Sequence, residues 1–236
     1  MPGALAMDVY DISLQAIDHN LKQLAVVSQN VANINTPGYL KSVPFAHYLG
    51  AGNELASGEL VTLTGGTIRE TSRVLDVAVV GQGFFQLELG GELVISRGGH
   101  FYLDNEQNLR HPSGAFVLGQ GGKINLSGDD ITIDGQGVIK LDGVEVDRFS
   151  IVSPMASSNI RPLGNGLYQL PMAQLNVVEG PGQQRVQQKA LNSANVNPSE
   201  EMVRMIEISR QLQSQQKVVN AWDQLLNVGI NELGKK

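Results

Sequence analysis

The two ends of the chain share one pattern that the long middle segment lacks. Near the start, positions four and three residues apart alternate at Tyr10, Leu14, Ile17, Leu21, Leu24, Ser28 and Val31. Near the end, the same spacing runs through Met205, Ile208, Leu212, Gln215, Val219, Trp222, Leu226, Gly229 and Leu233. A narrow apolar stripe with a mean spacing of about 3.5 residues is typical of a coiled-coil seam, which needs a partner helix. The pattern predicts that the ends pair with each other or with neighbouring copies, and it favours an assembly protein over an enzyme.

Both seams contain weak positions. Ser28, Gln215 and Gly229 stand where leucine would pack better. A polar seam residue lowers stability and can fix the register or the number of partners. Two interpretations stay open: the seam simply tolerates these residues, or the helices become ordered only when the protein assembles.

Turn and cap signals set the expected helix limits. The first helix is expected to begin between Asp8 and Asp11 and to stop at Asn35-Thr36-Pro37-Gly38, since proline removes a hydrogen-bond donor. The second helix is expected to begin at Pro198, with Asn197 as its cap, and to run to about Leu233.

The middle of the chain has strand patterning. Asp142-Gly143 lies between two β-rich runs and predicts a hairpin turn. We therefore predict an α+β fold in which a mostly antiparallel β domain is inserted between terminal helices packed as a coiled-coil stem. The expected parts are an N-terminal helix over 7–38, an extended linker with at most a hairpin over 39–73, a β-rich domain over 74–190, and a C-terminal helix over 191–236.

The composition narrows the function. The net charge of −6 argues against binding to nucleic acid or to an anionic membrane surface. The chain has no cysteine, which excludes disulfides and thiolate metal sites. No apolar run approaches the roughly 20 residues that span a bilayer, so no direct membrane insertion is expected. The first six residues lack the pattern of a secretory signal, so export would need a route without a cleaved signal peptide.

No constellation of catalytic or ligand-binding residues stands out. Gly81-Gln82-Gly83 lacks the third glycine of a dinucleotide-binding loop. The segment that begins at Asp130 starts like a calcium loop, but its twelfth position is Leu141 instead of a carboxylate. The four histidines are scattered along the sequence. We expect no catalytic, cofactor-binding or metal-binding residues, and therefore no enzyme and no cofactor.

Four separated motifs resemble the bacterial flagellar rod and hook proteins. They are Asn30-Val31-Ala32-Asn33-Ile34-Asn35-Thr36-Pro37-Gly38-Tyr39, the run from Leu75 to Phe85, Ser96-Arg97-Gly98-Gly99-His100-Phe101, and Asn192-Ser193-Ala194-Asn195-Val196-Asn197-Pro198. The resemblance covers nearly the whole chain, in order. The length and the short segment between Gly38 and Leu75 favour a proximal-rod member, whereas Gly81 to Phe85 is closer to the distal rod.

The resemblance implies a structural subunit of the flagellar basal-body rod. Such a subunit would polymerise helically with itself and with other rod subunits, transmit torque from motor to hook, enclose the export channel, and leave the cytoplasm through the flagellar export apparatus to span the periplasm. Each motif asparagine would act as a helix cap or as an intersubunit hydrogen-bond partner. The expected assembly interface comprises Leu14, Ile17, Leu21, Leu24, Asn30, Asn33, Thr36, Pro37, Gly38, Asn195, Asn197, Met205, Ile208, Leu212, Val219, Trp222 and Leu226. The alternatives are a distal-rod or hook-type member and a secreted β-domain binding module with helical oligomerisation arms.

Overall fold

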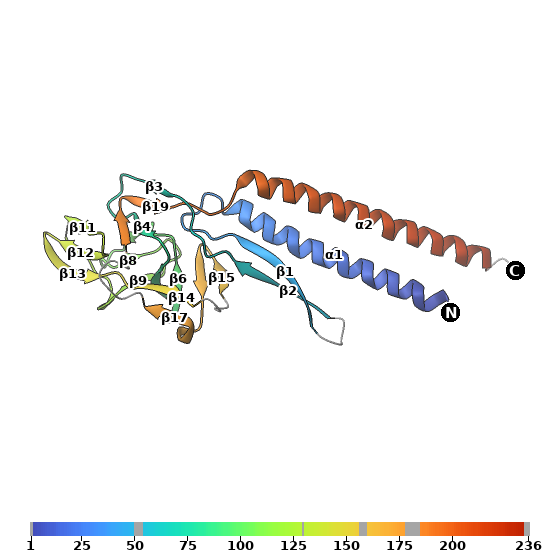
Figure 1. The fold of residues 1–236 in the computed structure, drawn as a ribbon, viewed down its shortest axis with the longest axis horizontal. Helices are drawn as coiled ribbons and strands as arrows, with labels where there is room; N and C mark the ends of the chain where they lie inside the picture. Colours follow the sequence, from blue (N-terminus) through green and yellow to red (C-terminus); the bar gives the residue numbers. More distant parts are fainter. Residues whose placement is uncertain (1, 50–53, 129, 156–159, 178–184, 234–236) are drawn as a thin grey trace. The chain divides into compact units, whose positions relative to one another are not determined.

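The computed structural model describes residues 2–49, 54–128, 130–155, 160–177 and 185–233. The described chain is α+β, with two helices and a mostly antiparallel β domain (Figure 1). It divides into two compact units. The first consists of residues 1–32, 43–59 and 197–236, and the second of residues 33–42 and 60–196.

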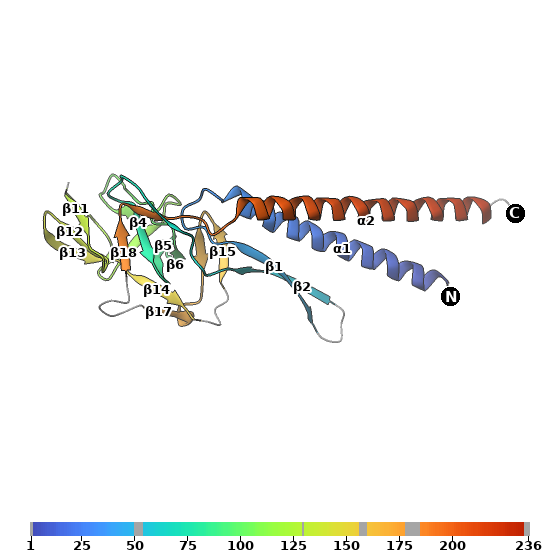
Figure 2. The ribbon, with the colours of Figure 1, turned by 45° about the horizontal axis from the view of Figure 1, so that its top comes forward.

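Two long helices run side by side in the first unit (Figures 1 and 2). Helix α1 spans Pro2–Ala32 and helix α2 spans Pro198–Leu233. The expected start of α1 between Asp8 and Asp11 is wrong, because the helix already begins at Pro2, where a missing N–H costs nothing. Helix α2 begins and ends where its cap signals predicted.

The segment 39–73 has more regular structure than an extended linker. It contains the hairpin of β1 (Ser42–Leu49) and β2 (Glu54–Val61), which pair only with each other among the described strands. It also contains β3 (Ile68–Glu70), which pairs with β19 (Ala190–Asn192). The pairing of β3 depended on a partner about 120 residues away, which local patterning does not reveal.

Most remaining strands form one antiparallel sheet of ten strands, in which β14 and β9 both pair with β5 and the main path runs β15-β16-β6-β5-β9-β8-β7. Separately, β11, β12 and β13 form a three-stranded sheet, and β18 pairs with β4. The predicted Asp142-Gly143 turn joins β12 to β13, and both of its residues have positive φ, at 51° and 81°. The bounds of these strands are β4 (Val77–Val80), β5 (Phe84–Leu89), β6 (Glu92–Ser96), β7 (Tyr102–Leu103), β8 (Leu109–Arg110), β9 (Phe116–Gly119), β10 (Gly122–Lys123), β11 (Ile131–Ile133), β12 (Val138–Leu141), β13 (Val144–Arg148), β14 (Ile151–Pro154), β15 (Arg161–Gly164), β16 (Leu167–Gln169), β17 (Leu175–Val177) and β18 (Arg185–Gln188).

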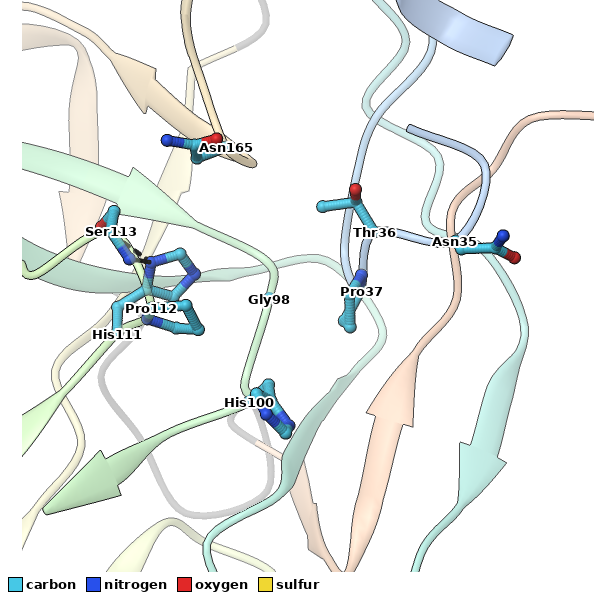
Figure 3. A pocket seen from close by; sticks show the side chains of 9 residues that line it. All are labelled: Asn35, Thr36, Pro37, Gly98, His100, His111, Pro112, Ser113 and Asn165. Atoms are coloured by element: carbon cyan, nitrogen blue, oxygen red, sulfur yellow. Dashed lines mark hydrogen bonds between the residues drawn. The ribbon is translucent and has the colours of Figure 1, made fainter. Parts of the chain in front are cut away.

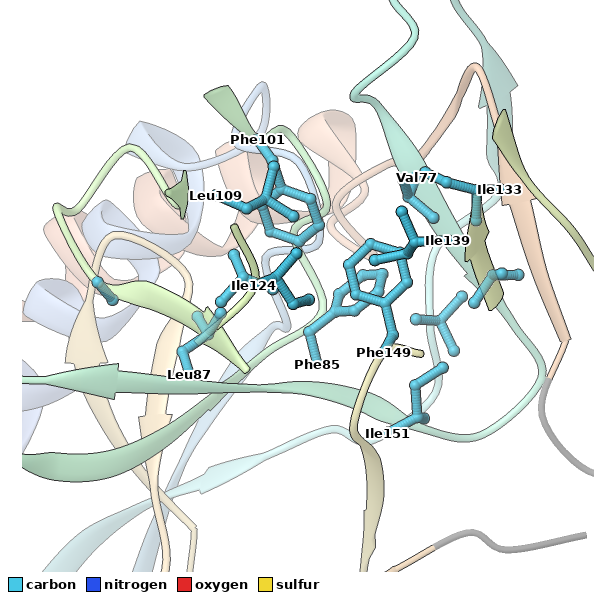
Figure 4. Close-up of a cluster of buried hydrophobic side chains, with 14 of the residues drawn as sticks. Val77, Phe85, Leu87, Phe101, Leu109, Ile124, Ile133, Ile139, Phe149 and Ile151 are labelled. Carbon is cyan, nitrogen blue, oxygen red and sulfur yellow. The ribbon is translucent and has the colours of Figure 1, made fainter. Parts of the chain in front are cut away.

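The core of the second unit is mostly aliphatic, with a small aromatic centre (Figure 4). Phe85 makes edge contacts with Phe101 and Phe149, at 5.1 Å and 5.3 Å between ring centroids. A second cluster gathers around Phe84 and Tyr168 and includes Leu40 from the segment that follows α1. Leu40 therefore ties this segment into the β domain by burial of apolar surface.

Candidate assembly site

The two asparagine-rich motifs meet in the second unit, at Asn195. Its Oδ1 accepts a hydrogen bond from the backbone N–H of Lys41, and its Nδ2 donates to the carbonyls of Thr62 (3.2 Å) and Thr64 (2.6 Å). Its own N–H donates to the carbonyl of Tyr39. One side chain thus joins the segment after α1, the segment after β2 and the segment before α2.

Asn192 makes a second junction close by in sequence. Its amide pairs with both backbone groups of Val79 on β4, at 2.9 Å and 3.0 Å, and its carbonyl accepts from the N–H of Gly38 at 2.7 Å. The side chain is almost fully buried, so each of these bonds satisfies a group that water cannot reach. This residue lies in a motif that the sequence singled out, but its role was not predicted.

The loop after α1 has its shape set by Thr36-Pro37-Gly38. The hydroxyl of Thr36 donates to Asn33 Oδ1 at 3.0 Å, and its N–H donates to the carbonyl of Asn33. Gly38 has φ of 69°, and a Cβ there would lie 2.2 Å from the backbone of Arg97 and Gly98. Only glycine fits this position, for steric and conformational reasons together.

Arg97 is a buried cation in the same region. Its Nη1 donates to the carbonyl of Gly83 at 3.2 Å and its Nη2 to that of Gly81, while its Nε has no hydrogen-bond partner. Burial lowers the pKa of the guanidinium below its ordinary value. Gly65 passes directly over it, since a Cβ there would lie 2.6 Å from Nε.

In the first unit, the two helices are joined by apolar and polar layers. Val27, Ile208 and Leu212 are buried together, with Ile17, Leu24 and Met205 packed against them. On either side, Asn30 Nδ2 donates to Glu201 Oε2 and Asn20 Nδ2 donates to Gln215 Oε1, both at 3.0 Å. These pairings set the helices antiparallel. Gln215, a weak position of the predicted seam, is therefore used as a hydrogen-bond partner.

The predicted interface residues fall into three groups. Those that the structure brings together are Ile17, Leu24, Asn30, Met205, Ile208 and Leu212 in the helix pair, and Gly38 and Asn195 with their hydrogen-bond partners in the second unit. Asn33 accepts from the hydroxyl of Thr36, and Asn197 accepts from the N–H of Ser199, each from a residue two or three positions along the chain. The others are exposed or half-buried (Leu14, Leu21, Pro37, Val219, Trp222), or, for the side chain of Leu226, outside the described residues. Their role between subunits stays a prediction.

Apolar residues outside the predicted seam are left on the surface of α2. Met202, Val203 and Ile206 are 57%, 54% and 54% exposed. They lie within five consecutive positions near the start of the helix. These three residues were not predicted, because the seam pattern follows a single stripe, although three apolar residues off that stripe are themselves a signal.

A half-open cleft of about 410 Å³ lies in the second unit, between the loop after α1 and the segments around Gly98, His111 and Asn165 (Figure 3). His111 is only 5% exposed. Its pKa is lowered to about 4, mainly because the ring is buried and to a smaller extent because His100 lies nearby. Its Nδ1 lies 2.8 Å from the Ser113 hydroxyl and accepts from the Ser113 N–H at 3.2 Å. His100 contacts Asp76 through Nδ1 at 2.8 Å and Arg73 through Nε2 at 2.7 Å.

These groups do not form a catalytic or metal centre. Within the described residues, no three histidine or carboxylate side chains are grouped to hold a metal ion. The two histidines have separate partners and do not form one relay with a serine and an aspartate. Among the described helices, none has an apolar stretch of the length required to cross a membrane.

Three family models match the chain in sequence order. A model of the flagella basal body rod protein matches residues 12–39, and a model of the flagellar hook protein FlgE/F/G D1 domain matches residues 78–141. A model of the C-terminal part of the flagellar basal body rod FlgEFG proteins matches residues 187–233.

Curated relatives are similar over nearly their whole length. The flagellar basal-body rod protein FlgG of Buchnera aphidicola subsp. Schizaphis graminum is 27% identical, over 91% of this chain and 95% of its own. The rod protein FlgF of Salmonella typhimurium is 29% identical, over 90% and 92%. FlgF of Caulobacter vibrioides is 26% identical, over 91% and 93%.

The fold and the similar proteins indicate the same class of protein. It has a long helix at each end of the chain and an antiparallel β domain between the two helices in the sequence. The chain belongs to the family of bacterial flagellar rod and hook proteins, as the resemblance of its motifs predicted.

Proposed function

We infer that this protein is a structural subunit of the rod of the bacterial flagellar basal body. The observation that carries the inference is the match to rod proteins along about nine-tenths of the chain, in sequence order. Those relatives are structural rod proteins and not enzymes, in line with a chain whose motifs are used for turns, caps and junctions. The protein acts in the basal body, together with other rod subunits in a polymer.

The finer picture is our proposal. We propose that α1 and α2 form a coiled-coil stem and pack beside the stems of neighbouring subunits to enclose an export channel, while the β domain makes lateral contacts. The buried layer of Val27, Ile208 and Leu212 supports the pairing within a subunit. Torque would then be carried from motor to hook by many interfaces in parallel. Export through the flagellar apparatus, and a location that spans the periplasm, follow from the family resemblance alone.

The exposed apolar face of α2 supports a further packing partner. Three exposed side chains as large as Met202, Val203 and Ile206 would each gain on the order of 1 kcal/mol or more when covered. A head-to-tail contact whose rotation does not close would produce an open filament. The choice between the FlgF-type and FlgG-type members stays open, because relatives of both types match with similar identity and coverage.

Polymerisation of the purified protein tests the proposal. We expect wild-type protein to form filaments above a critical concentration, seen by sedimentation and electron microscopy. Ile206→Glu should raise that concentration without changing the circular dichroism spectrum. Gln211→Glu is the matched control, since it adds the same charge at an exposed position of the same helix. Filaments of unchanged critical concentration from Ile206→Glu would argue against packing through α2. In the source bacterium, loss of the gene should remove the rod from isolated basal bodies and abolish motility.

A further inference from the structure

The floor of the cleft described above holds a hydrogen-bond donor without an acceptor. His111 Nδ1 accepts the Ser113 N–H, so in the neutral ring the proton is assigned to Nε2. No hydrogen bond of Nε2 exists within the described residues. A Cβ on Gly98 would lie 3.4 Å from Nε2, so the absence of a side chain at Gly98 leaves this nitrogen open to the cleft (Figure 3). A side chain that is 95% buried thus presents one N–H to whatever enters.

The lining of the cleft is neutral. Asn35 and Asn165 are exposed on opposite sides of its rim, and no aspartate, glutamate, lysine or arginine lines it. Both ring nitrogens of His100 already have partners within the chain, because Nε2 lies 2.7 Å from Arg73 and Nδ1 lies 2.8 Å from Asp76. A charged ligand would lose hydration in the cleft without gaining a counter-charge, which is unfavourable. Each asparagine amide offers both a donor and an acceptor, which suits a peptide backbone.

In one respect the cleft differs from a typical small-molecule site, because few aromatic rings line it. Such sites are lined mainly by apolar and aromatic side chains. Apart from the two imidazoles, no aromatic ring lines this cleft. Its chemistry fits a neutral stretch of polypeptide that presents backbone carbonyls.

The chain carries such a stretch on its own surface. Gly90 and Gly91 form the turn between β5 and β6, with φ of 62° and 88°. Both are exposed, and a Cβ on either would meet nothing within 4 Å, so the bare backbone of the turn projects into open space. The neighbouring Glu92 is held by Gln169 Nε2 at 3.0 Å.

Other turns of the second unit suit the cleft less well. The Asp142-Gly143 turn carries an exposed carboxylate, which the neutral lining does not match. The carbonyls of Gly81 and Gly83 already accept from Arg97. Neither residue of the Gly90-Gly91 turn carries a carboxylate, and no hydrogen bond to their carbonyls is found within the described residues.

Turn and cleft lie at opposite ends of one hairpin. The β5–β6 pairing runs from Leu89 and Glu92 beside the turn to Phe85 and Ser96 at the other end, and Gly98 follows two residues after Ser96. At about 3.3 Å per residue, the two ends are on the order of 20 Å apart. A contact between the turn of one copy and the cleft of the next would therefore be head-to-tail, and it would repeat without using up either surface.

We propose that the cleft receives the Gly90-Gly91 turn of a second copy of this chain, with His111 Nε2–H donating to a carbonyl of that turn. The proposal deepens the inferred rod function, on which it rests, by naming one contact of the polymer. The asparagines of the rim bind the backbone on either side of the turn.

Disulfide trapping tests the contact in a chain that has no cysteine of its own. Asn35→Cys places a thiol on the rim and Leu89→Cys places one beside the turn, both at exposed positions. The proposed contact would bring the two cysteines of neighbouring copies close together, and a disulfide forms when the Cα atoms are about 4.4–6.8 Å apart. We therefore expect polymers of the double variant to give a ladder of disulfide-linked oligomers on mild oxidation. The control pairs Asn35→Cys with Val144→Cys, at a position that is 68% exposed on β13 and should give no ladder.

Sedimentation of the same samples separates failure of the contact from failure of the rod function. Polymers that pellet normally but give no ladder would overturn the turn-in-cleft contact and leave the rod function standing. Absence of polymer from the wild-type protein as well would overturn both.

Asn165→Asp gives a second readout, since it adds a charge at the neutral rim with almost no change in shape. We expect it to raise the critical concentration about tenfold, whereas Asn105→Asp, at another exposed asparagine of the second unit, should leave it unchanged. Equal critical concentrations for the two variants would contradict the contact.

Discussion

Asn195 shows how one side chain can hold together segments far apart in the sequence. Its amide satisfies three backbone groups, those of Lys41, Thr62 and Thr64, in a place where strand pairing does not reach them. A carboxylate could not donate to the two carbonyls, and glutamine would not have the same reach. The motif around Asn195 is thus explained by contacts within one chain.

Replacing Asn195 by alanine should therefore destabilise the second unit. Three backbone groups would lose their partner, which we expect to cost roughly 2–4 kcal/mol of unfolding free energy, measured by urea denaturation. Asn35→Ala is the matched control, because Asn35 is exposed, and it should change that free energy by less than about 0.5 kcal/mol. Equal effects of the two substitutions would show that Asn195 does not hold the junction.

His111 should make stability depend on pH. Its folded pKa of about 4 lies below the ordinary value of 6.5, because burial and His100 disfavour the charged ring. Above pH 6.5 the ring is neutral in both states. As the pH falls from 6.5 to 4 the unfolded chain takes up the proton first, so unfolding becomes easier by up to about 3 kcal/mol.

The measurement compares urea unfolding of wild type and His111→Asn between pH 7 and pH 4. Asparagine can keep the acceptor toward Ser113 but does not titrate. We expect the variant to lose less stability than wild type over this range. Parallel pH curves for the two proteins would contradict a buried neutral His111.

At the scale of elements, the helix pair combines a small apolar layer with two polar ones. Asn30 and Glu201 are 1% and 0% exposed, so their hydrogen bond is made out of reach of water. Glu201 also lies in the first turn of α2, where the helix dipole favours a negative charge. Such a layer fixes the register of two helices more strictly than leucines alone, because a slip would break this buried hydrogen bond.

A double-mutant cycle tests this layer. Glu201→Ala should cost roughly 2–3 kcal/mol, because it removes the buried acceptor of the Asn30 amide. Adding Asn30→Ala should cost less than in the wild-type background, with a coupling energy of about 1 kcal/mol or more. Glu207→Ala, at an exposed position of the same helix, is the control. Additive effects, followed by the helical circular dichroism signal, would mean that the two residues act independently.

Elements marked by local signals could be predicted from the sequence. Asn197 and Pro198 gave the start of α2, and Asp142-Gly143 gave a hairpin turn, because caps and turns need particular residues at particular positions. The pairing of β3 with β19 and the contacts of Asn192 could not be predicted, since they depend on groups about 110 to 120 residues away. The cleft could not be predicted for the same reason, because Asn35, His111 and Asn165 share no sequence pattern and lie together only in the folded chain.

At the scale of the whole molecule, the buried apolar clusters of the described residues differ greatly in size between the two units. The helix pair buries a cluster of three apolar residues among those described, Val27, Ile208 and Leu212. The largest cluster of the β domain buries eighteen. Since burial of apolar surface is the main stabilising contribution, the helix pair should be much the weaker unit in the monomer.

We therefore predict two unfolding transitions for the monomer, with the helices melting first. Trp222, the only tryptophan, lies on α2, so its fluorescence reports the helix pair. Hydrogen exchange of residues 8–35 and 198–233 should be faster than that of residues 74–190.

Two substitutions test whether the transitions are separate. Val27→Ala should lower the midpoint of the first transition and Leu87→Ala that of the second, because their side chains belong to separate clusters. In filaments, exchange of the helices should slow towards that of the β domain, because neighbouring stems would cover surfaces such as Ile206. A single coincident transition, with helices as protected in the monomer as in the polymer, would mean that the stem is already rigid and that assembly joins preformed surfaces.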